Sequence, residues 1–292
     1  MKGEEQGMVW LMGILPAAAA LYLFLIAPGR HARRRGSALP RVPYAHRGLH
    51  GGGVPENSLT AFRLAAEKGY GIELDVHLTR DGELAVMHDA TLKRMCGVDQ
   101  RIADLTAREV RRMTLLGSRE KVPLLRDALE IIEPFAPPLI VEMKSDGASW
   151  RALPQKLLQA MEEYPGFWCA ESFDPRMLRW MKRHAPQVVR GQLAFDPRRA
   201  GEKRRGIHYI FGAHLLMNAL SRPDFVAYRH DTDGNFSFRV MRRLFHPPLA
   251  AWTVQCPEDF EKLREHYDVQ IFEGFEPYIP RNDPEKEKEK PT

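Results

Sequence analysis

Residues 71–78, GIELDVHL, set the first constraint on the fold. Side chains alternate between the two faces of a strand, so the apolar residues at 72, 74 and 76 share one face, and Glu73, Asp75 and His77 share the other. In a barrel strand the apolar face packs on helices and the polar face points inward. Neighbouring buried carboxylates repel each other without a counter-charge. This stretch therefore predicts an inward-facing site for a divalent cation, with an exposed edge strand as the alternative.

Further apolar segments along the chain alternate with amphipathic stretches. The predicted strands are 42–46, 71–78, 139–144, 167–173, 188–194, 224–229, 249–255 and 269–275. The predicted helices are 58–68, 124–132, 149–164, 175–184, 236–245 and 257–265. This alternation favours an α/β fold, a (β/α)8 TIM barrel, with a doubly wound open sheet as the alternative. Residues 89–123 interrupt the alternation of strands and helices with a polar, Arg-rich sequence that has a helix signal near 106–113. They are predicted to form a small insertion after the second strand, over one end of the barrel.

The N-terminal segment is continuously apolar, unlike the alternating pattern of the rest of the chain. Residues 8–27, MVWLMGILPAAAALYLFLIA, carry no charge over twenty positions, enough to span a hydrocarbon core of roughly 30 Å as a helix. A cleaved signal peptide is the alternative, but Lys2 is the only basic residue ahead of the segment. Several arginines follow it, and the positive-inside rule then places the remainder of the chain in the cytoplasm. We predict a single-pass cell-membrane anchor (1–27), a basic linker (28–40), a barrel domain (41–280) and a disordered tail (281–292).

Composition and short motifs exclude several functional classes. The net charge is +5 over 292 residues, and the Lys and Arg residues are spread along the chain, so no nucleic-acid partner is predicted. The three cysteines are isolated and have no spacing for zinc or for a disulfide framework. The glycines at 51–53 lack the Lys-Ser/Thr that completes a nucleotide-binding loop. No G-x-S-x-G elbow of a serine hydrolase is present.

Residues 139–144, LIVEMK, repeat the pattern of 71–78. Glu142 and Lys144 share a strand face at the carboxyl end, where barrel active sites assemble. Glu142 can complete a carboxylate set with Glu73 and Asp75, and Lys144 can meet an anionic substrate oxygen. A plain Glu–Lys ion pair is the alternative. Because oxygen ligands suit Mg²⁺ and Ca²⁺ alike, the sequence predicts one divalent cation without deciding which.

Two histidines lie at strand ends. His46 closes the first strand, and His88 follows ELAVM at 83–87. A lone histidine at a strand end is usually structural, but a pair near a carboxylate cluster can accept and donate protons. Arg47 adds a fork of donors suited to a phosphate. Together with a cation and Lys144, these groups favour displacement at a phosphoryl centre. The histidines interpreted as structural or surface residues are His50, His77, His184 and His214.

The motifs AHRG (45–48), PENSLTAF (55–62), IELDVHLTRDGELAVMHD (72–89) and VEMK (141–144) resemble, in this order, the glycerophosphodiester phosphodiesterase family. The similarity continues through ESFDPRML (171–178), VRGQL (189–193), AWTVQ (251–255) and IFEGFEP (271–277). The resemblance implies a TIM barrel with a small insertion after the second strand. It also implies hydrolysis of glycerophosphodiesters to sn-glycerol 3-phosphate and an alcohol, dependent on a divalent cation.

The resemblance further implies roles for single residues. Asn57 is expected to cap the following helix. Members of the family commonly use the substrate's own glycerol hydroxyl as the nucleophile, so that the reaction passes through a cyclic phosphate. The implied metal ligands are Glu73, Asp75, Glu142 and, from the Glu-Asn pair, Glu56; the implied acid/base pair is His46 and His88; the implied phosphate ligands are Arg47 and Lys144.

Two departures from the family pattern lie beside the expected substrate pocket. Gln255 stands where many relatives have Asn, and residues 272–277, FEGFEP, stand where many end Thr-Asp-x-Pro. Headgroup preference is therefore open; Trp252 is a candidate pocket wall for an alkyl or choline group, with barrel filling as the alternative. The competing functions are a lysophospholipase D acting on membrane lysophospholipids, a phosphoinositide-type phospholipase C, and an inactive membrane-tethered binding module.

Overall fold

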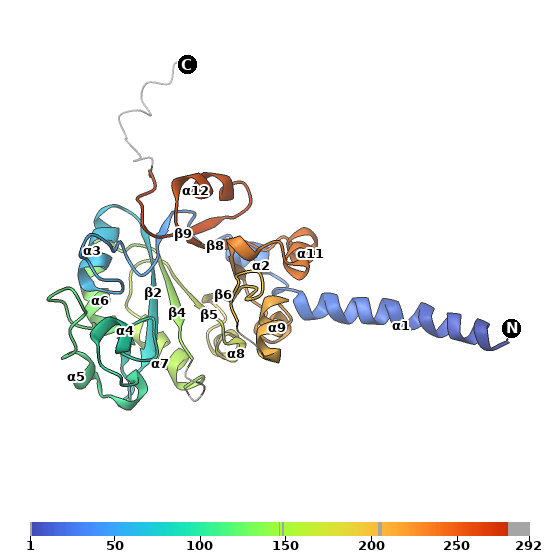
Figure 1. Ribbon diagram of the computed structural model, residues 1–292, viewed down its shortest axis with the longest axis horizontal. Coiled ribbons are helices and arrows are strands. Elements are labelled where there is room, and N and C mark those ends of the chain that lie inside the picture. The colour runs from blue at the N-terminus through green and yellow to red at the C-terminus, as the bar shows by residue number, and fades with distance from the viewer. Residues whose placement is uncertain (1, 146, 148, 204–205, 280–292) are drawn as a thin grey trace, which may run out of the picture.

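The computed structural model describes residues 2–145, 147, 149–203 and 206–279, so the predicted tail at 281–292 lies outside it. Parallel strands form a closed barrel surrounded by helices (Figure 1). In sequence order they are β1 (Tyr44–Ala45), β2 (Gly71–Leu78), β4 (Leu139–Met143), β5 (Trp168–Ser172), β6 (Val189–Ala194), β7 (Phe225–Arg229), β8 (Leu249–Val254) and β9 (Val269–Phe272). Because β1 pairs in parallel with both β2 and β9, the sheet closes on itself. The predicted barrel is confirmed, and the open-sheet alternative is wrong.

The helices around the barrel follow most of the predicted segments. They are α3 (Leu59–Glu67), α6 (Leu125–Ile132), α7 (Ala152–Ala160), α8 (Pro175–His184), α9 (Ile207–Ala213), α10 (Asn218–Ser221), α11 (Phe236–Phe245) and α12 (Pro257–Leu263). The sequence analysis did not predict α9 and α10. The apolar side chains of α9 are largely exposed, so they do not form the buried stripe by which a helix is recognised in a sequence.

The alternation in β2 sorts its side chains as predicted. Ile72, Leu74 and Val76 belong to the apolar layer between the barrel and its helices. Glu73 and Asp75 are buried on the other face, inside the barrel. A second apolar cluster fills the barrel on strands β1 and β4 to β9, and it includes Tyr44, Ile140, Cys169, Phe225 and Ile271. The interior therefore changes from apolar to acidic along the strands.

Residues between β2 and α6 form a small subdomain. Its elements are β3 (Leu84–Val86), which pairs antiparallel with the end of β2, α4 (Lys93–Cys96), a 3-10 turn (Ile102–Asp104) and α5 (Ala107–Val110). Thr106 and Glu109 form a capping box at the start of α5. The subdomain has its own apolar cluster, centred on Met87, Leu92, Ile102, Val110 and Leu124. Figure 1 shows α4 and α5 together beside β2.

The N-terminal segment forms α1 (Lys2–Ile26), which extends away from the barrel (Figure 1). Across the described residues, no helix combines the length and the apolar character needed to cross a membrane, and the predicted transmembrane helix finds no support there. Residues 28–40, predicted as a linker, contain α2 (Ala32–Gly36). Arg35 in α2 donates to Asp224 Oδ1 at 2.8 Å, which ties this segment to the start of β7.

Candidate active site

The chain turns sharply after β1 because two residues adopt left-handed backbone conformations. Arg47 has a φ of 55° and Gly48 a φ of 79°. A Cβ at position 48 would lie 2.8 Å from the backbone of Ala61, so only glycine fits this place. The turn brings the backbone N–H of Arg47 to Glu73 Oε2 at 3.0 Å and leaves His46 Nε2 3.9 Å from the same oxygen. The AHRG motif thus sets an imidazole and a guanidinium against the acidic face of β2.

The glycines at 51–53 are suited to the backbone conformation of this loop, and no neighbouring group in the described part of the chain lies close enough to require a residue without a side chain. Their φ values are 119°, 58° and 93°, a region that side chains disfavour. A Cβ at any of the three would meet nothing within 4 Å. Gly51 N donates to Val54 O at 2.9 Å, which closes a tight turn. These residues let the loop reverse direction before Glu56 returns to the site.

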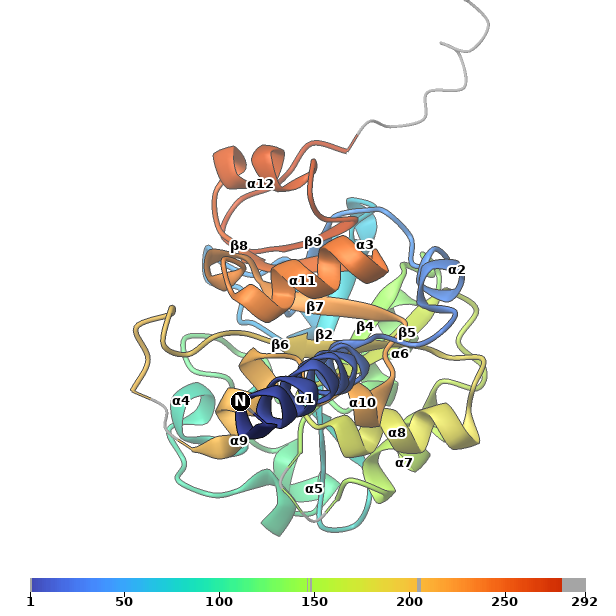
Figure 2. The same ribbon diagram turned by 90° about the vertical axis from the view of Figure 1, so that its right-hand side faces the viewer.

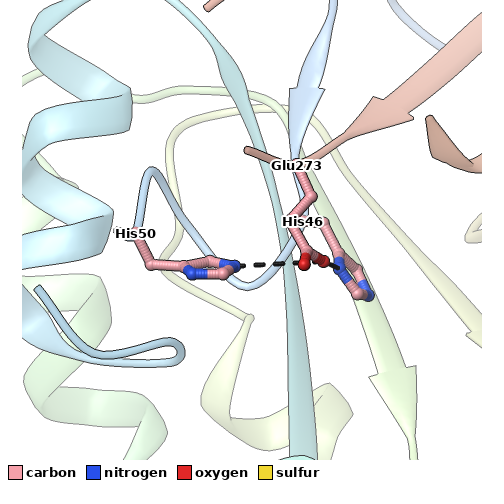
Figure 3. A group of neighbouring side chains, drawn as sticks. All are labelled: His46, His50 and Glu273. Carbon is pink, nitrogen blue, oxygen red and sulfur yellow. Dashed lines mark hydrogen bonds and ion pairs between the residues drawn. The ribbon is translucent and has the colours of Figure 1, made fainter. Parts of the chain in front are cut away.

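The first imidazole is held by a carboxylate that the sequence analysis missed. His46 Nδ1 lies 2.5 Å from Glu273 Oε2 (Figure 3). Burial lowers the pKa of His46 more strongly than Glu273 raises it. The hydrogen bond to His46 in turn lowers the pKa of Glu273 to about 2. Both directions agree with a neutral His46 that donates from Nδ1 to an ionised Glu273, which leaves Nε2 as the proton-accepting atom.

His50, interpreted from the sequence as structural or surface, also lies at this carboxylate. Its Nε2 is 4.0 Å from Glu273 Oε2 (Figure 3). His46, His50 and Glu273 offer ligand atoms that all lie within 4.8 Å of one another. The available signal for Glu273 was its place immediately after the last strand, in the FEGFEP departure from the family pattern.

The second imidazole follows β3 and is held by its sequence neighbour. His88 Nδ1 lies 2.6 Å from Asp89 Oδ1, and Arg94 Nε donates to Asp89 Oδ2 at 2.7 Å. Burial is the main cause that lowers the pKa of His88 to about 4, and Lys144 and Arg47 add to it. The His88 side chain is nonetheless 36% exposed, so the site opens to solvent at this histidine.

Three buried glutamates converge inside the barrel. Oxygens of Glu73, Glu142 and Glu171 lie within 4.8 Å of one another, and all three side chains are buried. Burial raises the pKa of each carboxyl, to about 7 for Glu142, and the neighbouring carboxylates raise Glu73 and Glu171 further. Glu171 was not predicted, although it occupies the inward-facing position of β5 directly opposite Glu142. The alternation in WCAES was the signal that could have identified it.

Asp75 lies in a cationic network rather than in that group of three. Lys144 Nζ is 2.9 Å from Asp75 Oδ1 and 2.6 Å from Glu142 Oε2, and Arg47 Nε is 3.4 Å from Asp75 Oδ2. Burial opposes ionisation of Asp75, but Lys144 and Arg47 outweigh it and hold its pKa below the usual range. Burial likewise opposes the charge on Lys144, yet Asp75 and Glu142 raise its pKa. The Glu142–Lys144 ion pair considered from the sequence is present.

The expected helix cap at Asn57 is wrong. Asn57 has a φ of 53°, and its Nδ2 donates to Asp75 Oδ2 at 2.8 Å. The cap of α3 is Ser58, whose side chain accepts from Ala61 N at 3.2 Å. The left-handed backbone at position 57 turns the amide towards β2, so this residue supports the site instead of the helix.

The remaining predicted metal ligand, Glu56, lies between two arginines. Arg47 Nη1 donates to its Oε1 at 2.9 Å and Arg94 Nη2 at 2.7 Å. Burial opposes ionisation of Glu56, but the hydrogen bond from Arg94 and the charge of Arg47 lower its pKa overall. Glu56 therefore joins Arg47 to the His88–Asp89–Arg94 chain, and its part in metal binding stays a prediction.

The acidic group fits a hard cation. Glu171 Oε2 is buried and has no hydrogen-bond partner in the described part of the chain. Burying an unpaired carboxylate oxygen is costly, and several carboxylates this close cannot all ionise without a counter-charge. Oxygen donors in this arrangement suit Mg²⁺ or Ca²⁺. The residues present thus form a possible metal site.

Trp252 belongs to an aromatic group at the ends of β5, β6 and β8. Its ring lies 5.7 Å from that of Phe173 and 6.0 Å from that of Phe195, both edge-on. Phe173 is exposed, and Trp252 is partly exposed. These rings form an apolar wall at the same end of the barrel as the two histidines.

The fold and the site define the class of protein: a closed parallel barrel that carries two carboxylate-held imidazoles and a group of buried carboxylates at the carboxyl ends of its strands. The chain belongs to the glycerophosphoryl diester phosphodiesterase family, whose sequence profile matches residues 46–267.

Curated relatives agree with this assignment. The chain is 35% identical over 158 residues to the glycerophosphodiester phosphodiesterase of Caldanaerobacter subterraneus subsp. tengcongensis, a match that covers 51% of this chain and 65% of that enzyme. It is 31% identical over 245 residues to the uncharacterized protein YqiK of Bacillus subtilis, covering 80% of this chain and 94% of YqiK. The match therefore spans slightly less than two thirds of the first of these relatives.

Solved structures show the same fold. A phosphodiesterase of Oleispira antarctica, in complex with the product sn-glycerol-3-phosphate, is similar with a TM-score of 0.66 at 20% identity, covering 82% of this chain and 94% of that one. The glycerophosphodiester phosphodiesterase of Thermotoga maritima has a TM-score of 0.60 at 24% identity, covering 79% and 93%. At these identities the likeness concerns the fold.

Proposed function

We propose that the protein hydrolyses glycerophosphodiesters to sn-glycerol 3-phosphate and an alcohol. The observation that carries this proposal is the pair of imidazoles, each bonded through Nδ1 to a carboxylate, at the edge of an acidic interior. Membership of the family and the product bound by the Oleispira antarctica phosphodiesterase support the same reaction.

In this mechanism one imidazole accepts the proton of the attacking hydroxyl, and the other, whose pKa the anionic substrate raises on binding so that it carries a proton, protonates the leaving alcohol oxygen. The attacking group is the neighbouring glycerol hydroxyl of the substrate. It forms a new P–O bond as the ester P–O bond breaks, and water then opens the cyclic phosphate. Arg47 and Lys144 bind the non-bridging phosphate oxygens, and Glu273 and Asp89 hold His46 and His88 in the required tautomers. Diesters without such a hydroxyl, such as bis(p-nitrophenyl) phosphate, should then be poor substrates.

We propose that one divalent cation, Mg²⁺ or Ca²⁺, occupies the acidic interior. The ligands predicted from the sequence are Glu73, Asp75, Glu142 and Glu56, and Glu171 is added because its free oxygen faces the same carboxylates. When bound, such a cation neutralises charge on phosphate oxygens and makes a coordinated hydroxyl more acidic.

A lysophospholipase D activity on membrane lysophospholipids is the second candidate. The exposed ring of Phe173 beside Phe195 and Trp252 favours it, because this wall can take an alkyl chain or a choline group.

The test uses the purified full chain with glycerophosphocholine and with lysophosphatidylcholine, before and after EDTA, followed by Mg²⁺ or Ca²⁺. Release of glycerol 3-phosphate that EDTA abolishes and one cation restores supports the proposal. A folded protein that releases product from neither substrate is the inactive binding module instead. Activity that survives both EDTA and His88→Ala contradicts the mechanism.

We also propose that residues 8–27 attach the protein to the cell membrane with the barrel in the cytoplasm. The apolar side chains Ile14, Leu15, Leu21 and Phe24 of α1 are exposed, and several arginines follow the helix. Protease added to intact spheroplasts should leave the barrel uncut until the cells are lysed. Cleavage of the barrel in intact spheroplasts contradicts the cytoplasmic location.

A further inference from the structure

An exposed apolar surface covers neighbouring parts of α9 and α11. Ile207 is 71% exposed, Phe236 63% and Leu244 58%. Ile210 and Phe211 of α9 are exposed as well. We call these five residues the apolar face. Scattered single apolar residues are ordinary on a surface, whereas a group on adjacent helices marks a contact with a partner or a membrane.

The helices that carry the apolar face, α9 and α11, lie on two sides of the point where α1 leaves the barrel. Figure 2 looks along α1, with α9, α10 and α11 around its base. Asn218 Nδ2 of α10 donates to Ile26 O at 2.8 Å, and Tyr22 Oη donates to Ser237 Oγ of α11 at 2.8 Å. Tyr22 also stacks on Phe236. These contacts hold the exposed apolar helix and the apolar face in one continuous surface.

Positive charge borders this surface. A cavity of about 750 Å³ beside α9 is lined by Arg198, Arg199 and Lys203 together with Ile210 and Phe236 of the apolar face. Arg239 and Arg243 are exposed on α11. Of the two acidic groups of the cavity, Glu202 pairs with Arg229 at 3.1 Å, and Asp196 accepts from Asn235 at 2.9 Å and lies 3.8 Å from Arg199 Nε, which leaves Arg198, Lys203, Arg239 and Arg243 in excess. The border is therefore basic.

We propose that the apolar face docks on the surface of a bilayer containing anionic lipids. Apolar side chains of an interfacial helix enter the boundary between headgroups and acyl chains, and neighbouring Arg and Lys meet the lipid phosphates. A second copy of the chain fits this surface less well. A two-fold dimer through this face would bring the like-charged borders of the two copies together.

One end of the apolar face lies at the end of the barrel that carries the candidate active site. Ile207 and Phe236 are the first residues of α9 and α11, and these helices begin at the end of the barrel where β6 and β7 finish. The inference goes beyond the proposed reaction, because lipid contact is measured without turnover. It adds a second membrane contact to the proposed attachment through residues 8–27. A label on the barrel detects this second contact separately.

The test places a fluorophore on the apolar face of the full chain. Ile207→Cys is labelled in a background with Cys96→Ser and Cys256→Ser, and Leu116→Cys is the matched control. Leu116 is 58% exposed and lies in the insertion. Each labelled protein is mixed with vesicles of phosphatidylcholine and phosphatidylglycerol that carry brominated acyl chains. Quenching of at least about twofold is expected at position 207 and none at 116, with weaker quenching at high salt because the charge contribution is screened.

An unlabelled variant extends the test. At a lipid concentration that binds only half of the unmodified protein, where the contribution of the apolar face adds to that of α1, Ile207→Gln with Leu244→Gln should lower the vesicle-bound fraction several-fold in sedimentation, and Leu116→Gln should leave it unchanged. Vesicle-bound protein without quenching at 207 would overturn the inference, since α1 alone would then make the contact. Failure to bind these vesicles overturns it too. A dimer in light scattering that becomes a monomer in the double variant would assign the face to a second copy instead.

Discussion

The two imidazole–carboxylate pairs differ in how the fold supports them. His46 directly follows the first barrel strand, and its partner Glu273 directly follows the last. Because β1 pairs with β9, closure of the barrel brings these two residues together. His88 and Asp89 are adjacent in sequence, and Arg94 of the insertion holds them. The His46 side chain is 14% exposed and that of His88 36%. One pair is therefore part of the scaffold, and the other is built locally beside solvent.

This difference predicts unequal sensitivity to change. A buried hydrogen bond has no water to replace a lost partner, whereas an exposed imidazole can exchange its partner for water. Substitutions around His46 should therefore disturb the reaction more than equivalent substitutions around His88, provided that both imidazoles transfer protons.

The largest effect is expected from removal of either imidazole. His46→Ala and His88→Ala should each lower kcat by ~10²–10⁴-fold, the usual contribution of one general acid or base. The measurement is release of glycerol 3-phosphate from glycerophosphocholine at saturating substrate. His184→Ala is the control, because His184 is an exposed residue of α8. A loss below about threefold for either variant would remove that histidine from the mechanism.

The next effect separates the two pairs directly. Glu273→Gln should lower kcat by about 10–100-fold, a range typical of residues that orient an active-site ligand. The amide can donate to Nδ1 and so select the wrong tautomer of His46. Asp89→Asn should lower kcat by a smaller factor, because water reaches His88 and can replace the lost hydrogen-bond partner. Steady-state kinetics of both variants, with unfolding temperatures as a check on the fold, test the order. Equal losses would show that exposure of the imidazole does not matter.

Arg94 should have a smaller effect. Arg94→Ala removes the bonds to Asp89 and Glu56 at 2.7 Å and so loosens the support of His88. We expect roughly a threefold loss in kcat, in line with the ~0.7 kcal/mol of a partly exposed ion pair. Arg119→Ala, an exposed arginine of the insertion, serves as the control. A loss of a hundredfold would indicate that Arg94 contacts the substrate.

The smallest effect concerns stability and the acidic interior. Burial raises the pKa of Glu142 to about 7 and raises those of Glu73 and Glu171. The folded protein holds these protons more tightly than the unfolded chain, so stability is greatest below the ordinary carboxyl pKa and falls as pH rises through about 7.

In EDTA, the unfolding temperature should therefore fall between pH 5.5 and pH 8. Glu171→Gln should make that fall about 2–4 °C smaller, which corresponds to ~1 kcal/mol in a domain of this size. The same measurement with Glu130→Gln, an exposed carboxyl of α6, is the control. A fall that Glu171→Gln leaves unchanged would show that Glu171 does not share the charge of the group.

Much of the barrel was predictable from local patterns. The alternation in GIELDVHL placed Glu73 and Asp75 inside because the pleat of a strand has a fixed period of two. Helices with buried stripes, such as α8 and α11, occur at their predicted positions. The helix α9 was not predicted, because its apolar residues are exposed and no local pattern distinguishes a surface helix of this kind.

The partners of the site residues depend on contacts between distant parts of the chain. Glu273 reaches His46 across a sequence separation of 227 residues. Asn57 has the residue type of a helix cap and precedes the predicted helix at 58–68, yet its left-handed backbone directs its side chain to Asp75, and Ser58 caps the helix. Glu171 alternates like Glu142, but only the register of β4 and β5 places the two opposite each other.

Local sequence patterns were enough to predict the strands, the inward face of β2 and the motifs that carry the two histidines, because these follow from short-range periodicity and residue chemistry. The tertiary structure decided which charges meet: Glu171 with Glu73 and Glu142, Asp75 with Lys144, and Glu273 with His46. Barrel closure and strand register set those distances, and the interaction of buried charges depends on distance and on exclusion of water.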